Sequence, residues 1–161
     1  MATIEAKLQA LGLALPAPMV LPPGMTLPFP WVKVYGNRAW VSGHGPQNPD
    51  GTLAAPLGKV GLEVSLEQAQ HAARLTALAM LGSLQRALGS LDRVASWLRV
   101  FGMVNAAPGF QQLPLVINGF SELIVELYGP ERGRHARSAV GLAELPLGIP
   151  VEIEAEVAID G

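Results

Sequence analysis

Hydrophobic and polar positions alternate most regularly near the end of the chain. Every second residue from 151 to 159 is apolar: Val151, Ile153, Ala155, Val157 and Ile159. Such alternation predicts a β-strand with one face against the core. The opposite face then carries Glu152, Glu154 and Glu156, and in most sheets such a row is simply the solvated side.

The preceding extended segment, residues 133–143, alternates differently. One side carries Ser138, Val140 and Leu142, and the other carries His135, Arg137, Ala139 and Gly141. Beside the Arg137 guanidinium this second side is made of small residues, which predicts room for a ligand against the strand. A guanidinium offers paired donors to a carboxylate or phosphate, so Arg137 is a candidate anion-binding residue. The alternative is a surface arginine paired with an acidic neighbour, which is the commoner arrangement.

Three segments have the three- and four-residue apolar spacing of helices. They are residues 4–11, 65–88 and 114–128, and each is followed by a glycine that can end a helix. Ser65 and Gln68 have the spacing of a capping box at the start of the second segment. Pro114 stands at a first helical position in the third.

Strands are predicted between these helices. Residues 31–35 and 38–42 flank Gly36-Asn37, two residues that tolerate positive φ, and this pattern predicts a β-hairpin. Residues 91–104 are apolar on both sides in their second half, which predicts a central strand.

Two segments lack a regular pattern. Residues 13–30 contain six prolines and interleaved apolar residues, so we expect an extended arm packed on a surface. Residues 43–58 are rich in glycine and proline and predict a loop, with Ser42 and His44 at its entrance. We interpret His44 as a solvent-exposed loop residue rather than a catalytic one.

The order of hairpin, helix, strand, helix and two strands predicts an α+β fold: a mixed β-sheet with two helices packed on one face. We expect a single domain over residues 1–161, with the Pro-rich N-terminal arm at about residues 1–30. Half of the residues are hydrophobic and only 15% are charged. Because the other sheet face lacks a cover, this balance predicts a closed symmetric oligomer with sites between subunits.

The amino-acid composition limits which side chains can take part in a reaction and which partners the protein is expected to bind. The chain has no cysteine, so serine, histidine, carboxylate and arginine side chains must carry any reaction. The formal net charge is −2 and basic residues cluster only over residues 132–137, so we expect no nucleic-acid partner. The sequence shows neither a secretory signal nor the roughly 20-residue apolar run that crosses a membrane. The expectation is a cytoplasmic protein with no membrane partner.

Several short motifs then fall into one pattern. They are Gly36-Asn37, Val41-Ser42-Gly43 with Pro46, Asn118, Arg137-Ser138, Leu145-Pro146 and Val151-Glu152-Ile153-Glu154-Ala155. From Phe29 onward these residues resemble the RidA/YjgF family, the reactive-intermediate imine deaminases. The Pro-rich arm and the longer loops are similar to a longer branch of that superfamily.

The resemblance implies a chorismate-mutase-like subunit and a homotrimer whose sheets form a barrel, with three clefts between subunits. It matches Arg137 to the arginine that binds the substrate carboxylate. It matches Glu152 to the glutamate that orients the attacking water.

Four further positions match substrate-binding positions of the family cleft. Ser42 and Asn118 match polar cleft residues, and Ala139 matches a position that contributes backbone contacts. The family's cleft tyrosine falls on Phe29, which keeps the ring and lacks the hydroxyl.

The implied reaction is hydrolytic deamination of a 2-imino acid, or its enamine tautomer, to a 2-keto acid and ammonia. A protonated imine is already electrophilic, so Arg137 and a water near Glu152 are enough for the reaction. The resemblance therefore implies neither a metal nor a cofactor. Two alternatives stay open: a non-catalytic module that binds a small imino or keto acid, and a ribonuclease. The presence of both Arg137 and Glu152 favours the hydrolase, and the weak basic character and lack of a suitable histidine pair disfavour the ribonuclease.

Overall fold

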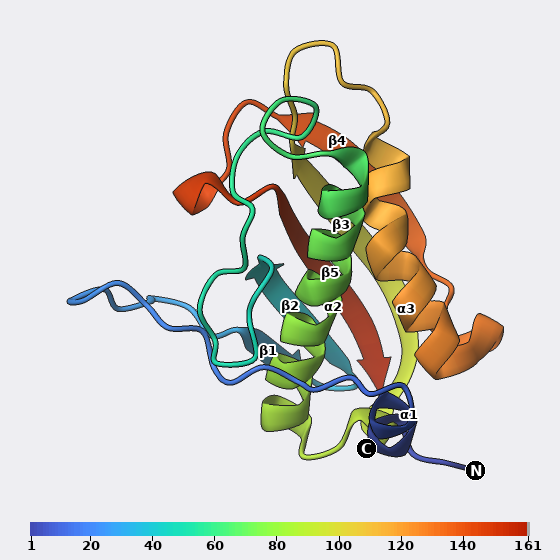
Figure 1. Cartoon of the computed structure of the whole chain (residues 1–161). Coiled ribbons are helices and arrows are strands. Elements are labelled where there is room, and N and C mark those ends of the chain that lie inside the picture. The colour runs from blue at the N-terminus through green and yellow to red at the C-terminus, as the bar shows by residue number, and fades with distance from the viewer. Residues whose placement is uncertain (161) are drawn as a thin grey trace.

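The computed structural model describes residues 1–160 and contains one five-stranded sheet with its helices on one side (Figure 1). The elements are α1 Ile4–Ala10, β1 Val32–Tyr35, β2 Arg38–His44, α2 Leu66–Leu88, the 3₁₀ turn η1 Leu91–Arg93, β3 Val94–Asn105, α3 Leu113–Gly133, β4 Ala136–Leu142, the 3₁₀ turn η2 Pro146–Gly148 and β5 Val151–Ile159. The strand order is β1-β2-β5-β3-β4, and only β3 and β4 run parallel. The predicted mixed α+β sheet is confirmed.

Helix α2 begins as its sequence predicts. The Ser65 side chain accepts from the Gln68 amide and the Gln68 side chain accepts from the Ser65 amide, so the capping box is formed. Gly89, at φ 84°, ends the helix. The helix packs closely on α3, because a Cβ at Gly119 would lie 2.1 Å from the Gln70 carbonyl oxygen.

Helix α3 carries the largest part of the aromatic core. Trp97 of β3 lies edge-on to Phe120 and Tyr128, with ring centroids 5.7 and 5.9 Å apart. Gly129 interrupts the helix at φ 76°, where the sequence predicts its end, and one further turn follows to Gly133. The short helix α1 adds to the same layer, with Ile4 and Leu8 buried.

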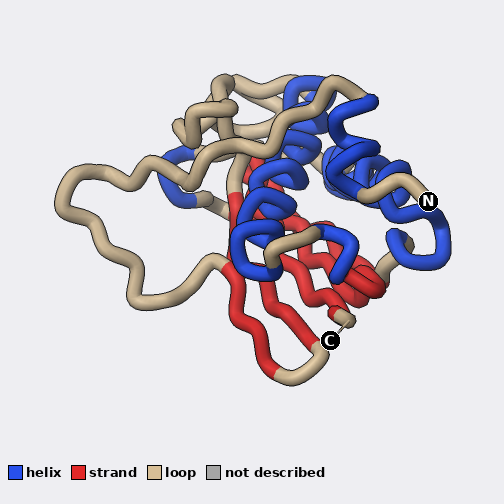
Figure 2. The backbone as a smooth tube through the Cα atoms, turned by 90° about the horizontal axis from the view of Figure 1, so that it is seen from below, coloured by secondary structure: helices blue, strands red, loops and turns tan. Residues whose placement is uncertain are grey.

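The two faces of the sheet differ. The five alternating apolar residues of β5 are buried, as predicted, and Glu152, Glu154 and Glu156 lie on the other face. Figure 2 shows the helices gathered on one side of the strands. Within residues 1–160 no helix covers the opposite face, where Trp40 remains 39% exposed. Burial of this open face in an oligomer stays a prediction.

The prediction for His44 is wrong. The residue is the last of β2 rather than part of an exposed loop, and it is only 2% exposed. Its ring packs on Trp31, with ring centroids 4.8 Å apart. The glycine-rich sequence after Ser42 suggests a loop, but the strand continues through it.

No helix within residues 1–160 has the length and apolar character needed to cross a membrane.

Candidate functional site

The candidate residues lie on opposite faces of the sheet within one chain. Arg137 pairs with Val100, a core residue of β3 whose side chain is fully buried under the helices. Glu152 pairs with Met103, three residues further along the same strand. Because side chains alternate along a strand and paired residues share a face, Arg137 is on the helix-covered face and Glu152 on the open face.

Arg137 lies against α3 at the edge of the sheet. Its Nη1 donates to the Asn118 Oδ1 at 2.9 Å and to the Ser121 Oγ at 3.1 Å, and its Nη2 donates to the Pro114 carbonyl oxygen at 3.3 Å. These partners are four and three residues apart, so they occupy one face of the helix. Three donor hydrogens are engaged in this way. No acceptor within residues 1–160 takes the Nε hydrogen or the second Nη2 hydrogen, so two donors remain for a ligand.

Ser121 connects Arg137 to His135. The His135 Nδ1 is 2.8 Å from the Gly133 carbonyl oxygen, so this nitrogen carries the proton and donates it. The Nε2 is 2.9 Å from the Ser121 Oγ and therefore accepts from the hydroxyl. Burial lowers the pKa of His135, the hydrogen bond to Gly133 opposes that effect, and the charge of Arg137 adds to it. Asn118, Ser121, His135 and Arg137 form what we call the arginine cluster.

The surroundings of Arg137 correct both expectations about its strand face. Its hydrogen-bond partners are neutral, so it is not a surface arginine paired with a carboxylate in the part of the chain that the structure describes. The small residues beside it receive α3 rather than a ligand. A Cβ at Gly141 would meet Leu113 at 3.4 Å, and Ala139 packs against the core. Within one chain, a ligand can therefore reach only the guanidinium of Arg137, which lies at the edge of the sheet, and not the strand face beside it.

Glu152 lies on the open face beside β2. A Cβ at Gly43 would lie 2.6 Å from its Oε2, so the carboxyl group fills the space that glycine leaves. Burial raises the pKa of Glu152, and the charge of Glu154 raises it further. Within residues 1–160 no hydrogen-bond donor is assigned to this carboxyl group. It is a half-buried base with acceptor capacity to spare.

An irregularity in β2 creates this arrangement. Val41 pairs with Ala155 and His44 with Ile153, so Ser42 and Gly43 together oppose the single residue Glu154. This is a β-bulge, a feature that bends a strand and redirects its side chains. The Ser42 hydroxyl donates to the Pro30 carbonyl oxygen at 2.8 Å and fastens the end of the arm to the bulge.

Two cavities lie near this part of the sheet, and Glu152 lines the second of them. The first, of about 490 Å³, lies over the open face and is lined by Phe29, Ser42 and Glu154 among others. The second, of about 320 Å³, is lined by Phe29, Gly43 and Glu152 together with the arm. Phe29 lines both cavities, is 47% exposed and lies edge-on to Trp31, with ring centroids 5.9 Å apart. We call Phe29, Ser42, Gly43 and Glu152 the glutamate cleft.

No metal-binding site is evident among residues 1–160. Among residues 1–160 there is no group of three or more histidine, aspartate or glutamate side chains placed to hold a metal ion.

Comparison with known proteins supplies the family. No protein-family model matches the chain. Protein TCP17 of Trypanosoma cruzi is 38% identical over 157 residues, which are 98% of this chain and 94% of that protein. A protein of unknown function from Agrobacterium tumefaciens is also 38% identical, with a TM-score of 0.86 over 99% of this chain and 93% of its own. A candidate endoribonuclease of Shewanella oneidensis is 27% identical, with a TM-score of 0.87 over 98% of this chain and 100% of its own.

The fold is also that of the YjgF gene product of E. coli, with a TM-score of 0.60 and 23% identity over 90% of this chain and 94% of that chain. The chain belongs to the RidA/YjgF family. The near-complete coverage by the Agrobacterium and Shewanella proteins includes the N-terminal arm, which supports a longer branch of RidA/YjgF proteins.

The residues that the RidA/YjgF resemblance selects are brought together in two groups and not in one. Arg137 and Asn118 are hydrogen-bonded, whereas Ser42 lines the first cavity, Glu152 lines the second and Phe29 lines both. Ala139 shares the face of Arg137 and is half-buried under α3.

Three residues of these groups were missed as site residues by the sequence argument. Ser121 lies one helical turn after Asn118, and His135 lies two residues before Arg137, so spacing alone could have indicated both. Gly43 was noted only as part of a family motif. Its close approach to Glu152 depends on the bulge, for which the sequence gives no signal of its own.

Proposed function

We propose that the protein hydrolyses reactive 2-imino acids to 2-keto acids and ammonia, at sites that two copies of the chain build together. One observation carries this proposal: Arg137 and Glu152 lie on opposite faces of the same sheet. An arginine that holds the substrate and a carboxylate that activates water must both approach one small molecule. They can do so only if the arginine cluster of one copy faces the glutamate cleft of another.

Arg137 is proposed to bind the substrate carboxylate. Neutral acceptors on α3 hold its Nη1, and two further donors remain for an anion. Burial lowers the pKa of Arg137, but the guanidinium stays protonated at neutral pH. A fixed fork of donors orients the planar imino acid as well as binding it.

Glu152 is proposed to act as the general base. It takes a proton from water as the water oxygen bonds to the carbon of the protonated imine and the C=N π electrons pass to nitrogen, which gives a neutral carbinolamine. The protonated carboxyl group then returns that proton to the amine nitrogen. The carbon–nitrogen bond breaks, the hydroxyl oxygen becomes the keto oxygen, and its proton leaves with ammonia as ammonium. A carboxyl with a raised pKa suits both proton transfers.

The assembly we propose is a homotrimer. The open sheet face carries Trp40, Phe101 and Val140 without a helix over them in residues 1–160, and such a face is typically buried between subunits. Sedimentation equilibrium measures the mass directly. A trimer agrees with shared sites, and a stable monomer at micromolar concentration contradicts them.

The ribonuclease alternative comes with the Shewanella protein, whose name describes a candidate endoribonuclease. Acid–base cleavage of RNA by histidines needs ring nitrogens that can exchange protons. Both ring nitrogens of His44 and of His135 are held by hydrogen bonds inside the protein. With a net charge of −2, we expect no RNA binding that weakens steeply with added salt.

The test uses an imino acid generated in place by an amino-acid oxidase, with the rate of 2-keto acid formation as the readout. We expect acceleration by the parent protein and a loss of about 10²–10⁴-fold in Glu152→Gln, the range for removal of a general base. Glu154→Gln, on the same strand and face, is the matched control and keeps most activity. If the parent shows no acceleration but binds pyruvate or 2-ketobutyrate through Arg137, the protein is a binding module instead.

A further inference from the structure

The 320 Å³ cavity beside Glu152 has a composition unlike the rest of the cleft. Its walls come from the N-terminal arm, the segment after the bulge and the turn η2, and they are predominantly apolar. The apolar lining residues include Met19, Leu21, Leu27, Leu53, Leu147 and Ile149. Glu152, at the edge of the cavity, is the only carboxylate, lysine or arginine among the lining residues that the structure describes.

The arm forms the roof of this cavity. Figures 1 and 2 show the arm as a long loop that leaves the body of the molecule and returns to the sheet. Its outward half is fixed by backbone hydrogen bonds from Ala17 to Pro49 and from Val20 to Gly51, at 2.9 and 3.0 Å. The approach is so close that a Cβ at Gly51 would lie 2.2 Å from the Pro18 carbonyl oxygen.

The arm then turns and comes back. The Met25 amide donates to the Pro22 carbonyl oxygen at 3.0 Å, and Gly24 has φ 78°, which are features of a type II turn. The return half ends at the Ser42–Pro30 hydrogen bond. The roof is therefore tethered at both ends, and the cavity exists before any ligand binds.

The arm presents its apolar side chains selectively. Met19 and Leu21 line the cavity and are half-buried, whereas Val20 between them points away and is 57% exposed. Leu147 forms the opposite wall, in a left-handed conformation at φ 59°.

Three polar side chains line the cavity, His44, Gln47 and Glu152, and the His44 ring is already satisfied. The His44 ring nitrogens bond the Ser42 carbonyl oxygen at 2.5 Å and the Ser83 Oγ at 2.8 Å. The cavity thus offers few polar partners to a charged or strongly polar group, and burial of such a group without partners is unfavourable. Because the rest of the lining is predominantly apolar, we expect a ligand group in this cavity to be apolar.

We propose that this cavity receives the apolar side chain of the substrate, so that the protein prefers 2-imino acids with branched, long or aromatic side chains over those derived from alanine or serine. The inference rests on the proposed function, because it places the reacting carbon beside Glu152 and the carboxylate outside the cavity. A volume of about 320 Å³ lies in the range of small-molecule sites, roughly 300–1,000 Å³. A methyl side chain leaves most of it empty.

The size of the preference follows from burial of apolar groups. Each buried methylene favours binding by a factor of about four. An imino acid derived from leucine has three more side-chain carbons than one derived from alanine. Its kcat/KM is therefore expected to be higher on the order of 50-fold.

The experiment compares kcat/KM for imino acids generated from alanine, 2-aminobutyrate, leucine, methionine and phenylalanine. The parent should show the preference for leucine over alanine. In Leu21→Asp that ratio should fall at least about tenfold, because an aspartate in the roof is a charge facing an apolar ligand. Val20→Asp, the adjacent outward-facing position, is the control and should keep the ratio of the parent.

A second variant, at a position outside the arm, keeps the test valid if Leu21→Asp disturbs the folding of the arm. Leu147→Asn removes an apolar wall at a position whose left-handed backbone asparagine adopts readily, so it should lower the same ratio without loss of stability. Equal kcat/KM values for alanine- and leucine-derived substrates in the parent would overturn the proposal. So would an unchanged ratio in both variants.

Failure of the proposed function gives a different result. In that case no imino acid is hydrolysed, and the affinities of pyruvate and 4-methyl-2-oxopentanoate are compared instead. Tighter binding of the larger keto acid, lost in Leu21→Asp and kept in Val20→Asp, supports the cavity assignment without catalysis. Equal affinities, or a second copy of the chain filling the cavity, overturn it.

Discussion

The carboxyl group of Glu152 occupies the space that any side chain at position 43 would need. A Cβ built on Gly43 lies 2.6 Å from the Oε2 and 2.9 Å from the carboxyl carbon, well inside van der Waals contact. Gly43 belongs to the β-bulge that faces Glu154, so the bulge and the absent side chain together give the carboxyl group its position.

This relationship predicts the effect of Gly43→Ala. The added methyl group displaces the end of a flexible side chain rather than backbone, so the fold should be kept. The displaced base should lose about 10–100-fold in kcat, because general-base catalysis depends on hydrogen-bond distance to the attacking water. Activity and circular dichroism are measured together. Combined with Glu152→Gln, the alanine should add little, and full additivity would show that it acts elsewhere.

The pH dependence of activity tests the ionisation of Glu152. Burial and the charge of Glu154 raise its pKa, and the base works only when deprotonated, so kcat/KM should fall as pH decreases through the raised pKa. In Glu154→Gln one of the two causes is removed. The acid limb should therefore move to lower pH, though not to the usual glutamate value, because burial remains. An unmoved limb would mean that another group titrates.

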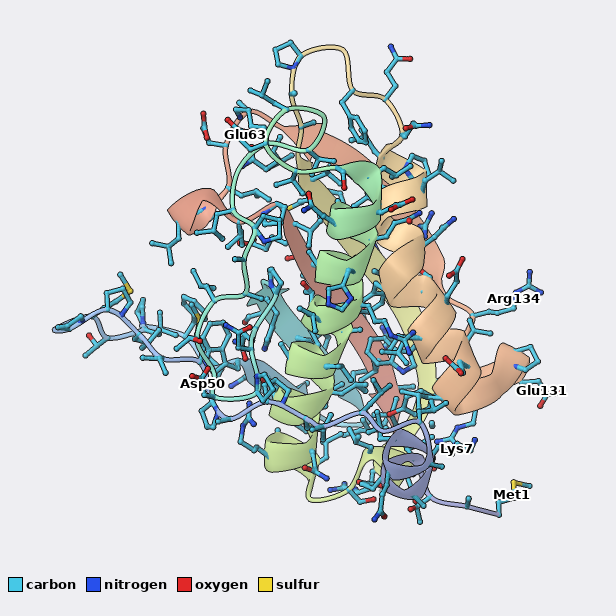
Figure 3. The ribbon with its side chains drawn as sticks, viewed as in Figure 1. Met1, Lys7, Asp50, Glu63, Glu131 and Arg134 are labelled. Atoms are coloured by element: carbon cyan, nitrogen blue, oxygen red, sulfur yellow. The ribbon has the colours of Figure 1, made fainter. Side chains whose placement is uncertain are left out.

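Arg137 is expected to account for anion affinity. Arg137→Ala should weaken 2-keto acid binding by at least about tenfold, since a charge-assisted hydrogen bond contributes about 1.5–3 kcal/mol. Arg137→Lys keeps the charge and loses the fork, so it should also bind more weakly. Arg134→Ala is the control, because Arg134 is three residues away, exposed and points away from the body of the molecule (Figure 3). Equal affinity of the Arg137→Ala and Arg134→Ala variants contradicts the role.

The burial of His44 predicts that the free energy of unfolding depends on pH, independently of the proposed reaction. Burial lowers its pKa to about 4, against the hydrogen bond to Ser42 and helped by the charge of Arg86. The folded state therefore binds the proton less readily than the unfolded state, whose pKa is near 6.5. The contribution is complete above pH 6.5 and is lost as pH falls towards 4, by about 3 kcal/mol in total.

Denaturant unfolding at several pH values measures this contribution. His44→Gln should unfold with a weaker pH dependence between 6.5 and 4 than the parent does. The same pH dependence in both proteins would show that His44 can be protonated without loss of the fold.

The sequence predicted much of the fold because its signals were local. Alternation in residues 151–159 identifies the buried face of β5, and the capping box of Ser65 and Gln68 marks the start of α2. These features depend on residues within one turn or one strand. The position of His44 depends on the bulge before it, which forms only when β2 pairs with β5.

The site was less predictable because it depends on register. Arg137 and Glu152 are both on strands that pair with β3, yet they face opposite sides. Arg137 pairs with Val100 and Glu152 pairs with Met103, and these two residues of β3 face opposite sides of the sheet. The difference depends on the register between strands, so neither the sequence of β4 nor that of β5 encodes it alone. The small residues Ala139 and Gly141 predict room for a ligand beside the strand, but α3 packs there instead.

The central claim is that one chain supplies the arginine and another the glutamate of each site. It can be tested with two variants that should each lose most of the activity at substrate concentrations below the parental KM, Arg137→Ala and Glu152→Gln. The two are co-expressed with different affinity tags, and oligomers that carry both tags are purified in two steps. Each variant purified alone with either tag is the control, and sedimentation confirms that assembly is unchanged.

In a closed ring of three, a mixed oligomer contains a single junction where an intact Arg137 faces an intact Glu152. The mixed oligomers should therefore recover about one third of the parental rate, well above the residual rate of either variant alone. If each site lies within one chain, every site in a mixed oligomer lacks one of the two residues. Mixed oligomers as inactive as their components would contradict the account.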